Sequence, residues 1–217
     1  MISNFKELER LFEEIDKSLS NRAHFFVIGG AMLLYHKLKM VTKDIDIVVD
    51  ESKEFQEVEL TLKTIGFSGK ITENEYKNFC LSQIFIRDDF RIDLFHRIVC
   101  KGFVLSEAMQ KRAHKILGLA HLTVSLCSEE DVFVFKNFTE REGDIEDCIS
   151  LAKKGLKWEI ILEEIKNQVR ILGHDVWITW IGERLDILEE RGLTIPIMKQ
   201  VNELREEFFI KYEKRLG

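Results

Sequence analysis

The sequence predicts an α/β domain over residues 1–126, followed by a helical domain over residues 127–217. Two short apolar runs, Phe25–Ile28 and Ile47–Val49, are rich in β-branched or aromatic residues and bounded by glycine or charge, which is typical of buried strands. Segments with apolar residues at helical spacing lie on either side of these runs. From about Cys127 to its end the chain shows helical spacing alone, and this change sets the domain boundary.

The remaining elements follow from the same patterns. Helical spacing over Phe5–Leu19 and Ser52–Ile65 predicts two amphipathic helices, the second ended by Gly66. Short apolar runs predict strands at 67–71, 79–86 and 90–95, and a hairpin over 114–126. Further helices are expected at 105–112, 128–138, 158–172 and 176–188, and after Pro196.

The composition is that of an ordinary globular protein. Of 217 residues, 45% are hydrophobic and 32% are charged, which excludes a disordered chain. No run has the length of a transmembrane helix and the first residues contain no signal-peptide core, so we expect a cytoplasmic protein. The net charge of −6 argues against a broad nucleic-acid-binding surface, but leaves a local basic patch open. No Cys-x-x-Cys pair occurs, which argues against zinc; the cysteines are Cys80, Cys100, Cys127 and Cys148.

Two aspartates in the second apolar segment point to a metal site. Strand side chains alternate between faces, so Asp44 and Asp46 are expected to share one face while Ile45 and Ile47 point into the core. Two carboxylates on one face repel each other unless a cation lies between them. Magnesium, which takes one or two carboxylates together with substrate phosphates, is the cation expected.

The first apolar run ends at Gly29-Gly30, where a phosphate could approach the backbone closely. The helix expected from near Ala31 would turn its positive end toward that phosphate. One strand end would then hold a triphosphate, and the next strand its metal. Lys43 would lie near the triphosphate, although an exposed basic turn explains this lysine equally well.

Asp93 is a single carboxylate among apolar residues in the strand expected at 90–95. A charge in that position is costly to bury without a partner. Asp93 is therefore expected to be a third carboxylate beside Asp44 and Asp46, and three carboxylates can hold two divalent ions about 4 Å apart. The alternative is a salt bridge to Arg91, which shares the same strand face.

The ordered pattern of strand, Gly29-Gly30, helix and Thr42-Lys43-Asp44-Ile45-Asp46 resembles the nucleotidyltransferase fold of the DNA polymerase β superfamily. It is most similar to the small prokaryotic branch that includes the abortive-infection toxin nucleotidyltransferases. The resemblance covers residues 24–96 and implies a mixed-sheet nucleotidyltransferase fold followed by a C-terminal helical domain, with the site in the cleft between them. It also implies that Asp93 helps to deprotonate the attacking hydroxyl.

A second block, residues 128–148, extends the resemblance. The toxin-like branch often carries a helical lysine followed by an arginine and an Asp-x-x-Asp, and Lys136, Arg141, Asp144 and Asp147 match that pattern. The resemblance implies that these residues bind the nucleotide. Asp144 and Asp147 share a helical face, so an internal ion-pair network joining the helical half to the sheet is the alternative.

The resemblance implies magnesium-dependent transfer of a nucleoside monophosphate from a nucleoside triphosphate to an acceptor. The acceptor could be an RNA end, a protein hydroxyl or a small molecule such as an aminoglycoside. The competing hypothesis is a catalytically silent nucleotide-binding or partner-binding module, for example one half of a toxin–antitoxin pair. A protein partner or a second copy of the chain could bind through the C-terminal helices.

Overall fold

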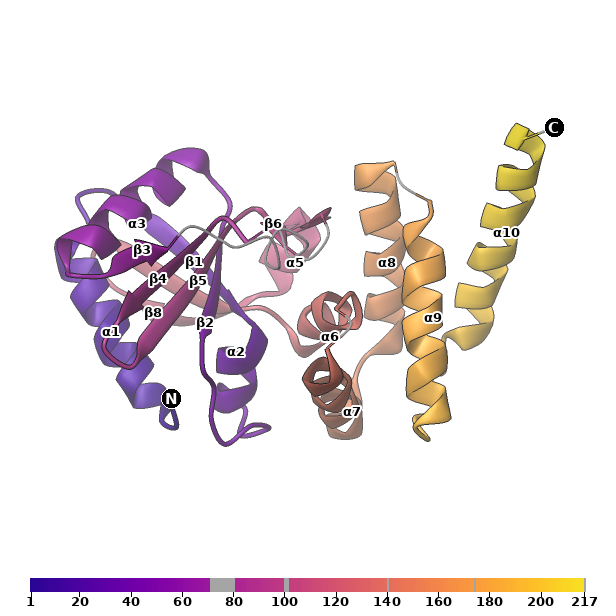
Figure 1. Cartoon of the computed structure of the whole chain (residues 1–217), viewed down its shortest axis with the longest axis horizontal. Helices are drawn as coiled ribbons and strands as arrows, with labels where there is room; N and C mark the ends of the chain where they lie inside the picture. The colour runs from indigo at the N-terminus through magenta and orange to yellow at the C-terminus, as the bar shows by residue number, and fades with distance from the viewer. Residues whose placement is uncertain (71–80, 100–101, 140, 174, 217) are drawn as a thin grey trace. The chain divides into compact units, whose positions relative to one another are not determined.

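The computed structural model describes residues 1–70, 81–99, 102–139, 141–173 and 175–216 (Figure 1). Its contacts divide the chain into two compact units, Met1–Ser128 and Glu129–Gly217. The domain boundary placed between residues 126 and 127 stays a prediction. Parts of the strands expected at 67–71 and 79–86, together with Cys80 and Cys100, lie outside the described residues.

The first unit is built on a mixed sheet, as the sequence predicts. Its seven described strands run in the order β3-β4-β5-β2-β1-β9-β8. The pairs β2–β5 and β1–β9 are parallel, and the other neighbours are antiparallel. The strands are β1 (Ala23–Ile28), β2 (Ile45–Val49), β3 (Ser68–Lys70), β4 (Gln83–Arg87), β5 (Phe90–His96), β8 (His114–Gly118) and β9 (Leu122–Leu126).

Two helices, α1 (Phe5–Ser18) and α3 (Ser52–Thr64), contact each other and the sheet, and lie together in the ribbon (Figure 1). The ring centroids of Phe12 on α1 and Phe25 on β1 lie 6.0 Å apart, so α1 covers the face to which Phe25 points. Ile45 and Ile47 are fully buried and share that face by register. The opposite face therefore carries Asp46.

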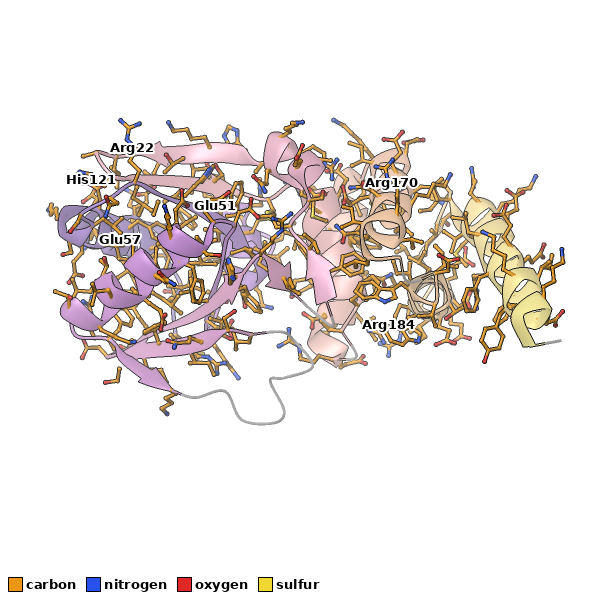
Figure 2. The ribbon with its side chains drawn as sticks, turned by 90° about the horizontal axis from the view of Figure 1, so that it is seen from above. Arg22, Glu51, Glu57, His121, Arg170 and Arg184 are labelled. Carbon is orange, nitrogen blue, oxygen red and sulfur yellow. The ribbon has the colours of Figure 1, made fainter. Side chains whose placement is uncertain are left out.

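Charged side chains of α1 and α3 form hydrogen bonds with other parts of the first unit. Glu57 of α3 (Figure 2) accepts a 2.7 Å hydrogen bond from the backbone amide of Ser20, in the loop between α1 and β1. Arg87 of β4 donates two 2.7 Å hydrogen bonds to the two carboxylate oxygens of Glu14 on α1. α3 is thereby linked to the loop between α1 and β1, and α1 is linked to the sheet.

Three shorter elements complete the first unit. α2 (Gly29–Tyr35) begins at Gly29, two residues before the expected start, and α5 (Glu107–Arg112) is capped by the Ser106 hydroxyl. A small antiparallel sheet of β6 (Ile98–Val99) and β7 (Phe103–Val104) was not expected. Two-residue strands are too short to produce a periodic pattern.

The second unit is helical. Its described helices are α6 (Glu129–Asn137), α7 (Glu142–Gly155), α8 (Trp158–Leu172), α9 (Trp177–Glu190) and α10 (Met198–Leu216). α6 contacts α7, α8 and α9, and α9 contacts α10. Gly173, with a φ of +65°, ends α8 in the left-handed conformation that favours glycine. Over the described residues, no helix combines the length and the apolar character needed to cross a membrane.

Candidate active site

Asp46 and Asp93 are neighbours in the sheet. β2 and β5 are parallel, and Asp46 is the register partner of Asp93. Ile28, the last residue of β1, is the partner of Asp46 on its other side. Register partners point to the same face of a sheet, so the two carboxylates share one face. Asp93 is only 6% exposed and Asp46 is half-buried.

Gly29, in the glycine turn after β1, packs directly against the carboxylate of Asp46 on β2. Its φ of +64° lies in the left-handed region, where a side chain would be strained. A Cβ on Gly29 would stand 1.9 Å from Oδ2 of Asp46, which is far inside van der Waals contact. The first glycine of the turn is therefore required both by its backbone conformation and by the Asp46 carboxylate beside it.

Arg91 forms a bidentate ion pair with Asp93. Its Nε donates to Oδ1 at 2.7 Å and its Nη2 donates to Oδ2 at 2.8 Å. The Arg91 side chain is 28% exposed, whereas that of Asp93 is 8% exposed. The salt bridge that the sequence offers as an alternative for Asp93 is thus present. A carboxylate has about four lone-pair sites, so these two hydrogen bonds do not by themselves use all of them.

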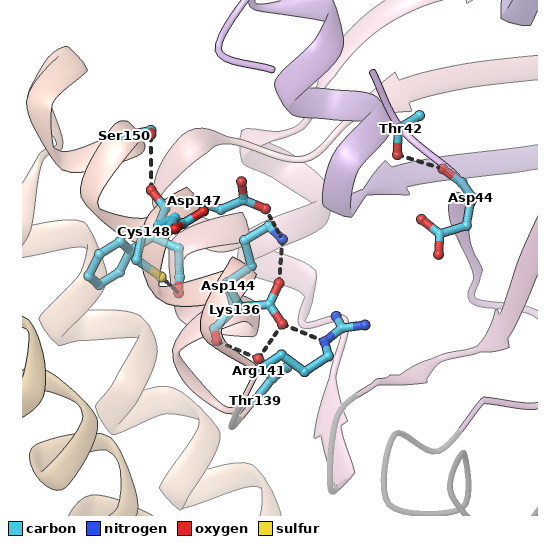
Figure 3. Close-up of polar contacts among 11 residues, drawn as sticks. Thr42, Asp44, Lys136, Thr139, Arg141, Asp144, Asp147, Cys148 and Ser150 are labelled. Atoms are coloured by element: carbon cyan, nitrogen blue, oxygen red, sulfur yellow. Dashed lines mark hydrogen bonds and ion pairs between the residues drawn. The ribbon is translucent and has the colours of Figure 1, made fainter. Parts of the chain in front are cut away.

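Asp44 lies immediately before β2 and is half-buried. Its carbonyl oxygen accepts a 3.0 Å hydrogen bond from Oγ1 of Thr42 (Figure 3). Gly30 packs against the same hydroxyl, because a Cβ there would stand 2.3 Å from Thr42 Oγ1. Lys43, between the two motif residues, is exposed.

Magnesium would have to be held by oxygen atoms of these carboxylates. Over residues 1–70, 81–99, 102–139, 141–173 and 175–216, no three His, Cys, Asp or Glu side chains are grouped so as to hold a metal ion. The donor chemistry nevertheless fits a hard cation, since the register places the carboxylates of Asp46 and Asp93 side by side on one face of the sheet.

The helical unit contains a second charged cluster, which centres on Lys136 of α6 (Figure 3). Its Nζ lies 2.7 Å from Oδ1 of Asp144 and 2.7 Å from Oδ2 of Asp147, both on α7. Arg141 contacts the other Asp144 oxygen through Nε at 2.7 Å, and the Thr139 hydroxyl hydrogen-bonds to that same oxygen. The cluster ties α6 to α7 within the helical unit.

Burial and charge act against each other in this cluster. Burial alone would lower the pKa of Lys136, but the charges of Asp144 and Asp147 outweigh it and hold that pKa above its ordinary value. Burial alone would raise the pKa of Asp144, but Lys136 and Thr139 hold it below its ordinary value. Lys136 and Asp144 are therefore both charged near pH 7. The neighbouring Cys148 thiol stays protonated, because burial raises its pKa to about 12.

These contacts bring the site residues expected from the sequence together in two groups. One contains Gly29, Asp46 and Asp93, with Asp44 and Gly30 linked to it through Thr42. The other contains Lys136, Arg141, Asp144 and Asp147. The observed ion pairs form an internal network between α6 and α7, while the link to the sheet that the alternative also predicts stays a prediction.

The sequence reasoning missed the roles of Thr42 and Thr139. Threonine hydroxyls often bond to backbone or carboxylate oxygens a few residues away, and the Thr-x-Asp spacing at Thr42 carries that signal. Thr139 reaches Asp144 only because α6 and α7 pack at this position, and no local pattern shows such packing.

A family described as nucleotidyltransferase of unknown function (DUF6036) matches residues 6–172 of the chain. The chain belongs to this family. The match includes both groups of site residues. No protein of curated function matches the chain.

Two solved structures share the nucleotidyltransferase fold of the chain. The solution structure of the antibiotic-resistance factor ANT(2'')-Ia has a TM-score of 0.52 at 13% sequence identity, covering 79% of this chain and 97% of that one. The crystal structure of ANT(2'')-Ia in complex with adenylyl-2''-tobramycin has a TM-score of 0.51 at 12% identity, covering 77% of this chain and 98% of that one. At such identities the likeness shows the fold alone.

Proposed function

We propose that the protein transfers a nucleoside monophosphate from a nucleoside triphosphate to an acceptor hydroxyl, releasing pyrophosphate. One observation carries this proposal: Asp46 lies between the Gly29 turn on one side and Asp93 on the neighbouring strand. A turn that can receive phosphates thus adjoins a pair of carboxylates that can hold cations. Family membership and fold support the same class of reaction.

The proposed reaction forms one bond and breaks one. The acceptor oxygen attacks the α-phosphorus, the bond from that phosphorus to the bridging oxygen breaks, and pyrophosphate leaves. Asp93 is the proposed base that takes the proton of the acceptor hydroxyl. The bidentate Arg91 pair holds the Asp93 carboxylate in one orientation.

Asp44 and Asp46 are the proposed magnesium ligands, with Asp93 completing the site for one or two ions. When bound, magnesium supplies charge neutralisation of the phosphates during transfer. Gly29 and Gly30 are the residues proposed to receive the phosphates, and Lys43 would provide an exposed positive charge next to Asp44.

Lys136, Arg141, Asp144 and Asp147 are proposed to contribute to nucleotide binding, as the family resemblance implies. The network favours a division of roles among them. Lys136 is 7% exposed and neutralised by two carboxylates, so it would act by holding Asp144 and Asp147. The Arg141 side chain is 62% exposed, so a phosphate can approach it from solvent.

A small-molecule acceptor is the first to test. The adenylyl-2''-tobramycin complex of ANT(2'')-Ia, which shares the fold, contains a modified small molecule. A net charge of −6 favours a cationic acceptor over a large RNA, because opposite charges speed encounter and like charges slow it. RNA ends and protein hydroxyls remain the other two classes.

The test is incubation with each α-labelled nucleoside triphosphate and magnesium, in parallel with aminoglycosides, total RNA and total protein. We expect label in one acceptor class with the wild-type chain and none with Asp46→Asn. Asp89→Asn, an exposed aspartate in the hairpin between β4 and β5, is the matched control and should retain transfer. Full activity of a folded Asp46→Asn variant would refute the metal role.

The alternative of a catalytically silent module draws support from the Arg91–Asp93 pair, because an arginine already satisfies this carboxylate. Calorimetry with magnesium and each nucleoside triphosphate separates the two functions. Binding without turnover on any acceptor would favour the silent module, including a role in a toxin–antitoxin pair. Turnover on any acceptor would exclude it.

A further inference from the structure

We infer that Thr42 is a positioning residue, which sets the place of Asp44 relative to the Gly29-Gly30 turn with the help of Ile2. The inference rests on the proposed function, because it assigns Thr42 to the same site. Thr42 itself is 3% exposed, so it acts on the site through its neighbours.

Asp44 needs such support because it lies outside the strand ladder. The register between β2 and β5 starts at the pair Ile45–Ile92, so Asp46 is held by strand pairing on both sides. Asp44 precedes this ladder by one residue. Its carbonyl oxygen is instead held by the Thr42 hydroxyl at 3.0 Å (Figure 3). The Thr42 hydroxyl therefore contributes to the placement of one proposed metal ligand.

The same hydroxyl also contacts the glycine turn. A Cβ on Gly30 would lie 2.3 Å from Thr42 Oγ1 and 3.2 Å from Thr42 Cβ, so only glycine permits this approach. The preceding glycine makes the matching approach to the Asp46 carboxylate. Gly29 thus packs against the side chain of Asp46, and Gly30 packs against that of Thr42. Together these contacts hold the Gly29-Gly30 turn next to the proposed metal ligands Asp44 and Asp46.

Ile2 holds the backbone of Thr42 from the other side. The two residues form an isolated antiparallel bridge, with Ile2 N donating to Thr42 O and Thr42 N donating to Ile2 O, both at 2.9 Å. Ile2 is 1% exposed, so its side chain anchors the bridge in the core. With both of its backbone groups engaged, the main chain of Thr42 is held in place, and from there its hydroxyl reaches Asp44 and Gly30.

The test compares Thr42→Val, which keeps the shape but loses the hydroxyl, with the conservative Thr42→Ser. Thr64→Val is the matched control, because the Thr64 hydroxyl also donates a 3.0 Å bond to a backbone oxygen, at an exposed position of α3. Mn²⁺ binding is measured by electron paramagnetic resonance with α,β-methylene-ATP, which cannot be cleaved at the bond in question. Hydrogen exchange of residues 29–46 reports the geometry independently of any activity.

We expect Thr42→Val to weaken Mn²⁺ binding about tenfold and to speed exchange in residues 29–46. Thr42→Ser and Thr64→Val should bind Mn²⁺ within about twofold of the wild-type chain. Unchanged exchange in Thr42→Val, or faster exchange with unchanged Mn²⁺ affinity, overturns the positioning role. A wild-type chain that binds no Mn²⁺ with the nucleotide analogue overturns the proposed function as well, so the two failures are distinguishable.

Discussion

Replacing Lys136 by methionine tests whether this buried lysine serves the fold or contacts the nucleotide directly. Methionine keeps an unbranched side chain of similar length but removes the charge. Asp144 and Asp147 would then be left buried without the ammonium that lies 2.7 Å from each. Their desolvation cost would no longer be offset by that charge.

The side chains of Lys136, Asp144 and Asp147 are 8%, 5% and 11% exposed, so solvent screening is weak. Removing one partner of a buried ion pair costs about 3–5 kcal/mol. For a urea slope of about 2 kcal/mol per M, the unfolding midpoint should fall by about 1.5–2.5 M. Lys154→Met is the control, because Lys154 pairs with Glu129 at the surface and should cost less than about 1 kcal/mol.

The pH dependence of this loss separates charge from packing. The pKa of Asp144 is lowered in the folded chain, so its pair adds stability above the unfolded value of 3.8 and loses it as pH falls through the folded value. The pKa of Lys136 is raised, so its contribution is complete below 10.5. The deficit of Lys136→Met should therefore be largest near pH 7 and shrink below pH 3.8, as pH falls through the folded-state pKa of Asp144.

The assay is urea unfolding at several pH values, paired with nucleotide affinity measured where each variant is fully folded. A deficit that is constant with pH would show that packing, and not charge, is lost. A loss of stability below about 1 kcal/mol together with a tenfold weaker nucleotide affinity would refute the network role and place Lys136 on the ligand.

Two further predictions concern the sheet. Gly29→Ala should cost about 1–2 kcal/mol of folding free energy from its φ of +64° alone, which urea denaturation measures. It should also abolish nucleotide transfer, because the new Cβ would displace the Asp46 carboxylate. Normal transfer by this variant in the label assay would contradict the reasoning. Arg91→Gln should destabilise the magnesium-free chain by leaving Asp93 without its arginine, and magnesium should raise the melting temperature of this variant more than that of the wild type. Equal magnesium effects in scanning calorimetry would show that no metal reaches Asp93.

Strand periodicity predicted the local geometry of the first group of site residues but not its assembly. Alternation alone places Arg91 and Asp93 on one strand face, and the observed ion pair follows from that spacing. The pairing of Asp46 with Asp93 joins residues far apart in the chain, and it depends on β2 and β5 being parallel neighbours. A single sequence carries no signal for that register beyond family resemblance.

Helical periodicity had the same limit in the second unit. The spacing of Asp144 and Asp147 predicts a shared face of α7, and the structure shows them together around one ammonium. The helix that supplies this ammonium is set by the packing of α6 on α7, which spacing does not specify. For this reason the sequence left the choice open between a ligand site and an internal network.

The two charged groups differ in whether their cation can be exchanged. Arg91 is 28% exposed and shares its strand with Asp93, so its guanidinium can turn toward solvent and let another cation use the carboxylate. The side chain of Lys136 is 8% exposed and lies between two carboxylates, so moving it would remove its charge from both, at a cost of several kcal/mol. Binding energy from a phosphate can offset the first rearrangement far more readily than the second. Cation exchange during a reaction cycle is therefore expected at Asp93, while the Lys136 cluster keeps the same ion pairs throughout.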